Sequence, residues 1–243
     1  MGDSVEELCN PHRSSREESL RAARRNAEDR RSYDIEIFRY LTLQLTAARV
    51  DVDIIERTLV FLAAVAPPAR LHGAIRTVLG HEDAHVRSKA AVTIGRCVAD
   101  LPLLQRLLTD SDPRVRANTL EALWQMKGSE VESIFMRALG DLHHRAVANA
   151  AYGLYLIDDQ KHRDKVSALI EHRSAGFRAA GAWLLGKIGD PKNLPLLKPL
   201  LLEKNAEVRS AAFRTLKTLR SLDPAKAEVK SETGSEAAVS DAA

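Results

Sequence analysis

Several classes of protein are excluded by what this chain of 243 residues lacks. Aromatic residues make up only 5% of it, and no run alternates polar and apolar side chains as a half-buried strand would, so a sandwich or barrel is disfavoured. No apolar stretch approaches the ~20 residues that a membrane-spanning helix needs, and no signal peptide opens the chain. Cys9 and Cys97 lack the spacing of a metal or redox site. We therefore expect a soluble, cytoplasmic, helical protein without a cofactor.

What the chain does have is a repeat, in which one arginine recurs about every thirty residues, within the period range of solenoids. The arginines are Arg57, Arg87, Arg116, Arg145, Arg178 and Arg209. Four residues before the last five of them stand Asp83, Asp112, Asp141, Ser174 and Asn205, whose side-chain oxygens suit a helix N-cap. Apolar residues then recur at helical spacing, and a small residue directly follows each of these five arginines. Each unit is thus predicted to pack against its neighbours.

The stretches DAHVRSKAAVTIG, from Asp83, and DPRVRANTLEALW, from Asp112, carry the pattern most clearly. They resemble the HEAT repeat, in the short bacterial form named after phycobilisome lyases, whose second helix reads D-x-x-V-R-x-x-A-x-x-A-L-G. The resemblance covers residues 33–221. It implies an all-α fold, a right-handed α-α superhelix (α-solenoid) of about six helix pairs. It also implies that Asp83, Asp112 and Asp141 pair with the repeat arginines in a ladder along the stack.

The repeat also predicts where the helices lie. First helices are expected near 34–48, 68–79, 100–109, 130–139, 160–171 and 192–202, and second helices near 52–65, 83–97, 112–126, 141–156, 174–188 and 205–221. Residues 1–32 are predicted to form a basic arm that is either helical or disordered, and residues 222–243 a disordered tail. The apolar first pair, around Ile35, Phe38 and Leu45, offers a surface for self-association.

One motif suggests zinc chemistry. His81-Glu82-Asp83-Ala84-His85 matches H-E-x-x-H, in which two histidines one helical turn apart bind zinc. Zinc binding requires all five residues on one helix, whereas Asp83 is predicted to begin a helix here. His143 and His144 form a second histidine pair, and His144 takes a repeat position that is Val or Phe elsewhere, so a packed imidazole is expected. These features predict no catalytic residue and no metal site, and the chain is interpreted as not an enzyme.

Three alternatives come from families of similar fold. Bilin lyases share the repeat, and deoxyhypusine hydroxylases use several His-Glu dyads where this chain has one. Some alkylpurine DNA glycosylases use aromatic and basic residues, here Trp124, Trp183 and Lys187, but two tryptophans at different repeat positions are a weak match. The net charge is only +3, and six of the cations are the repeat arginines, which are expected to be held within the stack, so nucleic-acid binding is not favoured.

The second helices carry one further pattern. With the N-cap counted as position one, positions three, seven, ten and fourteen share a helical face that the core does not need. On this face a strip of apolar residues and a charged rim are predicted to bind a protein partner in a groove. The strip is Val147, Ala150, Leu154, Ala180 and Trp183, and the rim is Lys187, Arg214, Arg96 and Lys89. The chain is thus predicted to be a non-catalytic scaffold for an apolar, somewhat acidic peptide. The alternative is an accessory enzyme of the lyase or hydroxylase type.

Overall fold

The helical hairpins predicted from the repeat are present in the structure, a computed structural model. It describes residues 42, 45, 51–65 and 71–222. Within these residues every regular element is a helix, and the predicted all-α solenoid fold is confirmed. The predicted arm (1–32), the tail beyond Leu222 and nearly all of the first expected helix lie outside the described residues. The chain divides into two compact units, Met1–Ile134 and Phe135–Ala243.

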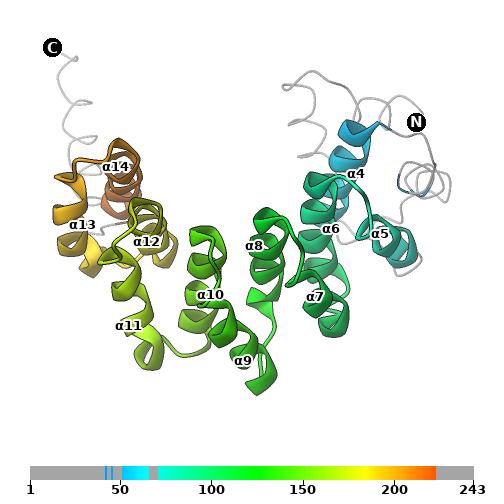
Figure 1. Cartoon of the computed structure of the whole chain (residues 1–243), viewed down its shortest axis with the longest axis horizontal. Helices are drawn as coiled ribbons and strands as arrows, with labels where there is room; N and C mark the ends of the chain where they lie inside the picture. Colours follow the sequence, from blue (N-terminus) through cyan, green and yellow to red (C-terminus); the bar gives the residue numbers. More distant parts are fainter. Residues whose placement is uncertain (1–41, 43–44, 46–50, 66–70, 223–243) are drawn as a thin grey trace, which may run out of the picture. The chain divides into compact units, whose positions relative to one another are not determined.

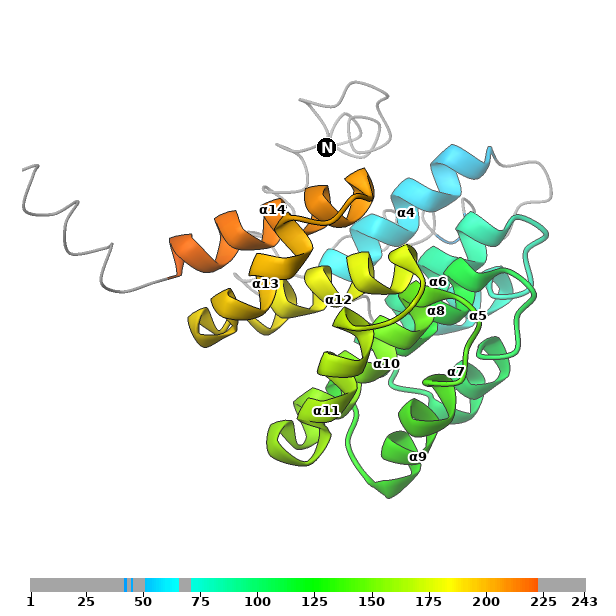
Figure 2. The same cartoon turned by 60° about the vertical axis from the view of Figure 1, so that its left-hand side comes forward.

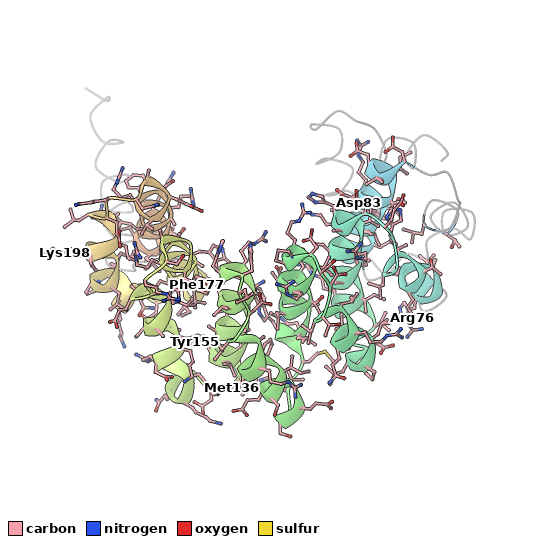
Figure 3. The ribbon with its side chains drawn as sticks, viewed as in Figure 1. Arg76, Asp83, Met136, Tyr155, Phe177 and Lys198 are labelled. Carbon is pink, nitrogen blue, oxygen red and sulfur yellow. The ribbon has the colours of Figure 1, made fainter. Side chains whose placement is uncertain are left out.

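In the first unit, second helices pack side by side and first helices cover them (Figure 1). The second helices are α4 (Val52–Val65), α6 (Ala84–Cys97) and α8 (Pro113–Ala122), the last extended by the short 3-10 helix η2 (Leu123–Gln125). The first helices are α5 (His72–Val78) and α7 (Leu101–Leu107), and α9 (Ser129–Ala138) begins in this unit and ends in the next. Arg76 on α5 and Asp83 at the start of α6 mark the two helices of one hairpin (Figure 3).

The second unit repeats this arrangement, with α10, α12 and α14 in contact one after another (Figure 2). Its second helices are α10 (His144–Ile157), α12 (Ala175–Ile188) and α14 (Ala206–Ser221). Its first helices are α11 (Asp159–Ile170) and α13 (Leu194–Leu201), the latter preceded by the 3-10 helix η3 (Pro191–Asn193). Most boundaries therefore lie within a few residues of those expected from the repeat.

Each second helix from α6 to α14 begins with the same short turn. Asp83 and Asp112 are N-caps as predicted, each accepting a hydrogen bond from the backbone N–H two residues ahead, at 2.7 and 2.8 Å. Asn205 caps α14 in the same way, whereas Ser174 holds the N-cap position of α12 without a side-chain bond. These caps satisfy N–H groups that the first helical turn leaves unpaired.

The exception is α10, whose predicted N-cap is wrong by two residues. Asp141 does not cap this helix; its Oδ1 accepts from the N–H of His143, and His143 is the N-cap, accepting from Arg145 N–H through Nδ1 at 3.3 Å. Asp110 holds the same place before α8, where it accepts from Asp112 N–H. The third repeat is therefore shifted by two residues, and Val147, not Arg145, occupies position five.

The arginine at position five ties its own turn together. One guanidinium nitrogen, Nη1, donates to the two backbone carbonyls that precede the N-cap residue. In α6 this is Arg87 to His81 and Glu82, at 2.7 and 2.8 Å. The same pair of bonds recurs from Arg116, Arg178 and Arg209. These four repeat arginines thus serve as structural supports for the turns.

The other edge of the guanidinium reaches the next turn. Arg87 donates from Nε and Nη2 to both oxygens of Asp110, at 2.8 and 2.9 Å, and Arg178 makes the same forked contact with Glu203. The bridging acid lies two residues before the N-cap, so the predicted pairing of the repeat arginines with Asp83 and Asp112 as ladder acids is corrected. Asp83 and Asp112 use their carboxylates to cap their own helices. The contact between neighbouring turns is therefore made by a different acid, such as Asp110.

Two arginines expected in the ladder have different surroundings. Arg57 pairs with Asp53, four residues earlier on its own helix α4. Arg145 is an exposed residue of the first turn of α10, because of the two-residue shift. Val147 is buried at position five, and the residue in the following turn that would meet an arginine is His172, not an acid. An unpaired carboxylate there would be costly, whereas His172 Nδ1 still accepts the Ser174 N–H at 3.0 Å.

Neighbouring second helices approach most closely where side chains are smallest. A β-carbon at Gly95 would lie 2.4 Å from Ala122 Cβ of α8, and one at Gly186 would lie 3.0 Å from Thr215 Oγ1 of α14. The buried Thr215 hydroxyl in turn donates to the Ala182 carbonyl at 2.7 Å. Close approach of this kind buries the alanine-rich faces and fixes the spacing of the helices in each unit.

The forked contact predicts a stability difference between two arginine-to-lysine substitutions. Arg87→Lys keeps the charge but cannot bridge four acceptors, so the free energy of unfolding should fall by about 1–2 kcal/mol. Arg76→Lys is the matched control, since Arg76 is more exposed and makes one contact, to Asp100 at 2.9 Å; its loss should be below about 0.5 kcal/mol. Urea denaturation followed by circular dichroism measures both, and equal effects would contradict the structural role.

Candidate functional site

The face predicted to bind a partner is only partly open to solvent. Of the predicted apolar strip, Val147, Ala150, Leu154 and Ala180 are buried, and Leu154 is completely inaccessible. Trp183 differs, with 41% of its surface exposed. The exposed strip predicted from the sequence is therefore wrong in four of its five members. The two-residue shift of α10 is the reason for the first three, because it turns them into the core.

When His143 is taken as the N-cap, position one, the open face of α10 no longer contains Val147, Ala150 and Leu154. Positions three, seven, ten and fourteen are Arg145, Asn149, Tyr152 and Leu156. Arg145 and Leu156 are exposed, Tyr152 is half-buried and Asn149 is buried. Tyr152 and Leu156 were missed from the sequence. The constant spacing of the turns at His143, Ser174 and Asn205 was the signal that could have identified them.

On this corrected face, Tyr152 of α10 contacts Lys187 of α12. Tyr152 donates from its hydroxyl to the Lys187 carbonyl at 3.5 Å, and Lys187 Nζ lies 6.0 Å from the centre of the Tyr152 ring. Lys187 is one helical turn beyond Trp183 on α12. Tyr155, which Figure 3 labels, stacks against Tyr152, with ring centres 6.4 Å apart. We call Tyr152, Leu156, Trp183 and Lys187 the aromatic face.

Small residues lie next to this face and cations flank it. Position seven is Ala180 in α12 and Ala211 in α14, both buried, so the backbone there is not screened by large side chains. Arg214, at position ten of α14, is exposed and donates to Ser210 Oγ at 2.9 Å. With Arg145 and Lys187 it gives the open face of the second unit three cations against one acid, Glu207. The face should attract a negatively charged ligand.

The open face of the first unit is polar and internally bonded. Arg114 donates from Nε to Asp112 Oδ1 and from Nη2 to Asp112 Oδ2, and its Nη1 lies 2.6 Å from His85 Nε2. This arginine holds the pKa of Asp112 well below its usual range. Lys89 and Arg96, predicted as part of the charged rim, belong to this unit and not to the aromatic face. Its polar groups largely satisfy one another, so this face offers less to a ligand.

The two histidines of the H-E-x-x-H motif do not share a helix. α6 begins at Ala84, so His81 lies in the preceding turn, where its Nδ1 accepts the Asp83 N–H at 3.0 Å. His85 lies within the helix and contacts Arg114. A zinc site of the metalloprotease kind needs both imidazoles directed from one helical face. The motif thus lacks that geometry.

A second histidine group lies at the starts of α10 and α12. The rings of His143 and His144 stack at 4.4 Å. Phe177, which Figure 3 labels, meets His144 edge-on at 6.1 Å and stacks on His172 at 4.1 Å. His144 is the first residue of α10, not a core residue as predicted, and Ala146 fills the expected core position. In the part of the chain that the structure describes, no three His, Cys, Asp or Glu side chains are grouped as metal ligands.

Comparison with known families identifies the repeat. A family model described as HEAT repeats matches residues 100–166 and 144–217. The chain is a HEAT-repeat protein. A search of curated proteins found no match. None of the described helices is long and apolar enough to cross a membrane, and the cytoplasmic location stays a prediction.

Solved structures of similar fold are distant in sequence. The complex of CpcE and CpcF of phycocyanin lyase from Nostoc is 18% identical with a TM-score of 0.52, and the match covers 90% of this chain and 93% of that one. YibA of Escherichia coli is also 18% identical, with a TM-score of 0.46 and coverage of 89% and 92%. Human deoxyhypusine hydroxylase is 14% identical, with a TM-score of 0.38 and coverage of 90% and 95%.

One of these neighbours corrects a prediction. The chain was interpreted as not an enzyme, yet the complex of CpcE and CpcF, which belongs to phycocyanin lyase, shares the fold at a TM-score of 0.52. The prediction that the chain is not an enzyme, which was drawn from the lack of catalytic motifs, is therefore corrected, because a protein of this fold can be part of an enzyme. The fold alone does not decide the question, because an identity of 18% carries the architecture and no active-site residues.

The histidine group predicts a pH dependence of stability. Burial lowers the pKa of His144, and His143 and Arg145 lower it further, against the opposing charge of Glu207. Because the unfolded chain takes up this proton near pH ~6.5 and the folded chain only at lower pH, stability should fall on acidification from about pH 7 to 5. His144→Gln should reduce that slope, by at most ~1.4 kcal/mol per pH unit. Thermal melts across this range test it, and an unchanged slope would contradict the assignment.

Proposed function

We propose that the second unit binds an acidic, partly apolar peptide or helix of a partner protein on the aromatic face. The observation that carries the proposal is Trp183, which is 41% exposed on α12, the helix whose Lys187 meets Tyr152. Large aromatic side chains are the most frequent anchors of protein interfaces, because they bury much area at little entropic cost. Leu156, 38% exposed, extends the apolar surface along α10.

The fold itself does not require a tryptophan at this place. Position ten of the second helices varies among Val92, Glu121, Tyr152, Trp183 and Arg214. These differ in size, charge and polarity, whereas core positions keep small or aliphatic residues. A residue that packing leaves free and that is nevertheless large and exposed is best explained by a ligand.

The charges around the aromatic face indicate the chemistry of the partner. Lys187 is beside the apolar residues and Arg214 is at the same position as Trp183 on the next second helix, which contacts α12. An amphipathic segment could place apolar side chains on Trp183 and Leu156 and carboxylates toward these two cations. Steering by the cations would mainly raise the association rate, while the apolar contacts would set the lifetime.

The comparisons are compatible with a protein partner. The phycocyanin lyase structure is a complex of two chains, CpcE and CpcF, and shares the fold of this chain. HEAT repeats commonly take part in protein interactions, and their second helices present side chains in a regular array. Both points support a binding role and leave the identity of the partner to experiment.

The proposal predicts a separation of binding from stability. Trp183→Ala should weaken capture of the main partner by about thirtyfold, since truncating an interface anchor typically costs about 2 kcal/mol. The melting temperature should change by less than about 2 °C, because half-exposed surface residues contribute little to folding. Affinity capture with mass spectrometry identifies the partner, and titration calorimetry with the purified partner then gives the change in affinity.

Met136→Ala is the matched control. Met136 is 43% exposed, close to the value for Trp183, but lies on α9, the first helix of its hairpin. The Met136→Ala variant should capture the partner as the wild type does. Normal binding by Trp183→Ala would remove the aromatic face as the site, and early unfolding of that variant would show that the ring is part of the core.

A further inference from the structure

The outer face of α14 differs from the equivalent face of every earlier second helix from α6 onward. Within each unit, positions five, nine and thirteen of a second helix face the next second helix, as the contacts of Arg87 with Asp110, Gly95 with Ala122 and Gly186 with Thr215 indicate. Position nine is buried in every second helix from α6 to α12, as Ala91, Leu120, Ala151 and Ala182. In α14 it is Phe213, which is 63% exposed. Arg209, Lys217 and Arg220 lie one or two turns from it on the same side and are also exposed. We call Arg209, Phe213, Lys217 and Arg220 the outer face.

Arg209 presents the same fork as the bridging arginines. Its Nη1 donates to the carbonyls of Glu203 and Lys204, at 2.6 and 2.7 Å, which fixes the guanidinium as it does for Arg178. In Arg87 and Arg178 the remaining edge, Nε and Nη2, binds a carboxylate of the following turn. Among the described residues no carboxylate meets that edge of Arg209. Nε and Nη2 of Arg209 are therefore positioned on the outer face to bind a carboxylate.

A further helical hairpin would not fit this face in the usual way. Between α12 and α14 the contact is made by Ala182 and Gly186, and a β-carbon on Gly186 would already be only 3.0 Å from Thr215. In α14 the corresponding residues are Phe213 and Lys217. These large side chains hold another helix too far away for the fork of Arg209 to reach its turn. The geometry favours a thinner occupant, an extended segment that carries carboxylates.

A second copy of the same face is also disfavoured. The outer face carries three cations and no acid, so two copies placed face to face would repel each other. The occupant must instead supply negative charge.

The chain itself contains a segment of this chemistry. Residues 223–243 directly follow the end of α14 and hold five acids, Asp223, Glu228, Glu232, Glu236 and Asp241, against the two lysines Lys226 and Lys230. The remaining residues are mostly alanine, serine and valine, which are small enough to pass over Phe213. We propose that the outer face of α14 binds the carboxylates of residues 223–243, with one of them in the fork of Arg209.

The length of the segment allows this contact. Arg209 and Leu222 are thirteen residues apart, about 20 Å along a helix that rises 1.5 Å per residue. An extended chain covers about 3.3 Å per residue, so Glu228 is the first acid that can return to Arg209, and Glu232 and Glu236 also can. Covalent attachment gives an effective concentration of about millimolar, enough to populate a contact that would be weak between separate molecules.

The test uses the full chain and a protease that cleaves after glutamate. Cleavage after Glu228, Glu232 and Glu236 is timed by mass spectrometry and normalised to the same bonds in a synthetic peptide of residues 223–243. In the wild type these bonds should be cleaved about fivefold or more slowly than in the peptide, since only the released segment is cut. Phe213→Ala and Arg209→Gln should each bring the rate close to that of the peptide.

The control is Arg163→Gln, which removes the same charge from α11, where Arg163 is exposed and 3.5 Å from Asp159. In Arg163→Gln the segment 223–243 should stay protected from cleavage. Loss of protection in this variant would show that the attraction is unspecific and would overturn the proposal. Cleavage of the wild type at the rate of the peptide would also overturn it. Protection that disappears on dilution together with a dimer in light scattering would assign the outer face to a second copy instead. Trp183→Ala should leave protection unchanged, so this result is independent of the aromatic face.

Discussion

The forked arginine at position five is the contact on which the repeat geometry depends. A turn between two helices leaves carbonyl groups without partners, and Arg87 and Arg178 each bind two of them while also holding an acid of the following turn. The N–H donors of a rigid planar guanidinium make this possible, and a lysine could not do the same. Since the turn determines where the next helix begins, the arginine also determines which residues of that helix face the solvent.

The third repeat shows what happens where this contact is missing. Val147 replaces the arginine, and His172 replaces the acid that would have paired with it. The two replacements belong together. If only the arginine or only the acid were present, its charge would lie unpaired in a partly buried turn. The junction between α10 and α12 is held instead by the stack of His143, His144, Phe177 and His172, in which attraction between rings takes the place of an ion pair. Such a junction should be less sensitive to salt and more sensitive to acid than its neighbours.

The sequence was sufficient to predict the fold but not to predict which residues of α10 are exposed on the open face. The period, the N-caps at Asp83, Asp112 and Asn205 and the helix limits follow from local preferences that the structure preserves. The error at Asp141 arose because Arg145 and Gly153 follow it at the same intervals as Arg87 and Gly95 follow Asp83. Gly153 in fact accommodates the ring of Phe135 in α9, whereas Gly95 accommodates α8, so the same letter serves two different contacts.

That single shift explains most of the difference between the predicted open face and the open face in the structure. A rotation by two residues turns a helix by about 200°, enough to exchange its buried and exposed sides. Val147, Ala150 and Leu154 thereby enter the core, and Tyr152 and Leu156 emerge on the face that Lys187 shares. Trp183 is exposed as expected, because the start of α12 was predicted correctly at Ser174. In a solenoid, a functional face is therefore only as well predicted as the start of the helix that carries it.

The end of the described stack has a different problem from its interior. A terminal repeat must expose the face that would otherwise pack on a neighbour, and solenoids usually make this face polar. Arg209, Lys217 and Arg220 follow that rule, but Phe213 does not, since a phenyl ring at 63% exposure gains nothing from water. A face that needed only to be soluble would carry a fourth polar residue at this position. The phenyl ring of Phe213 is better explained as part of a binding surface. Its ligand would then carry negative charge, opposite to that of Arg209, Lys217 and Arg220.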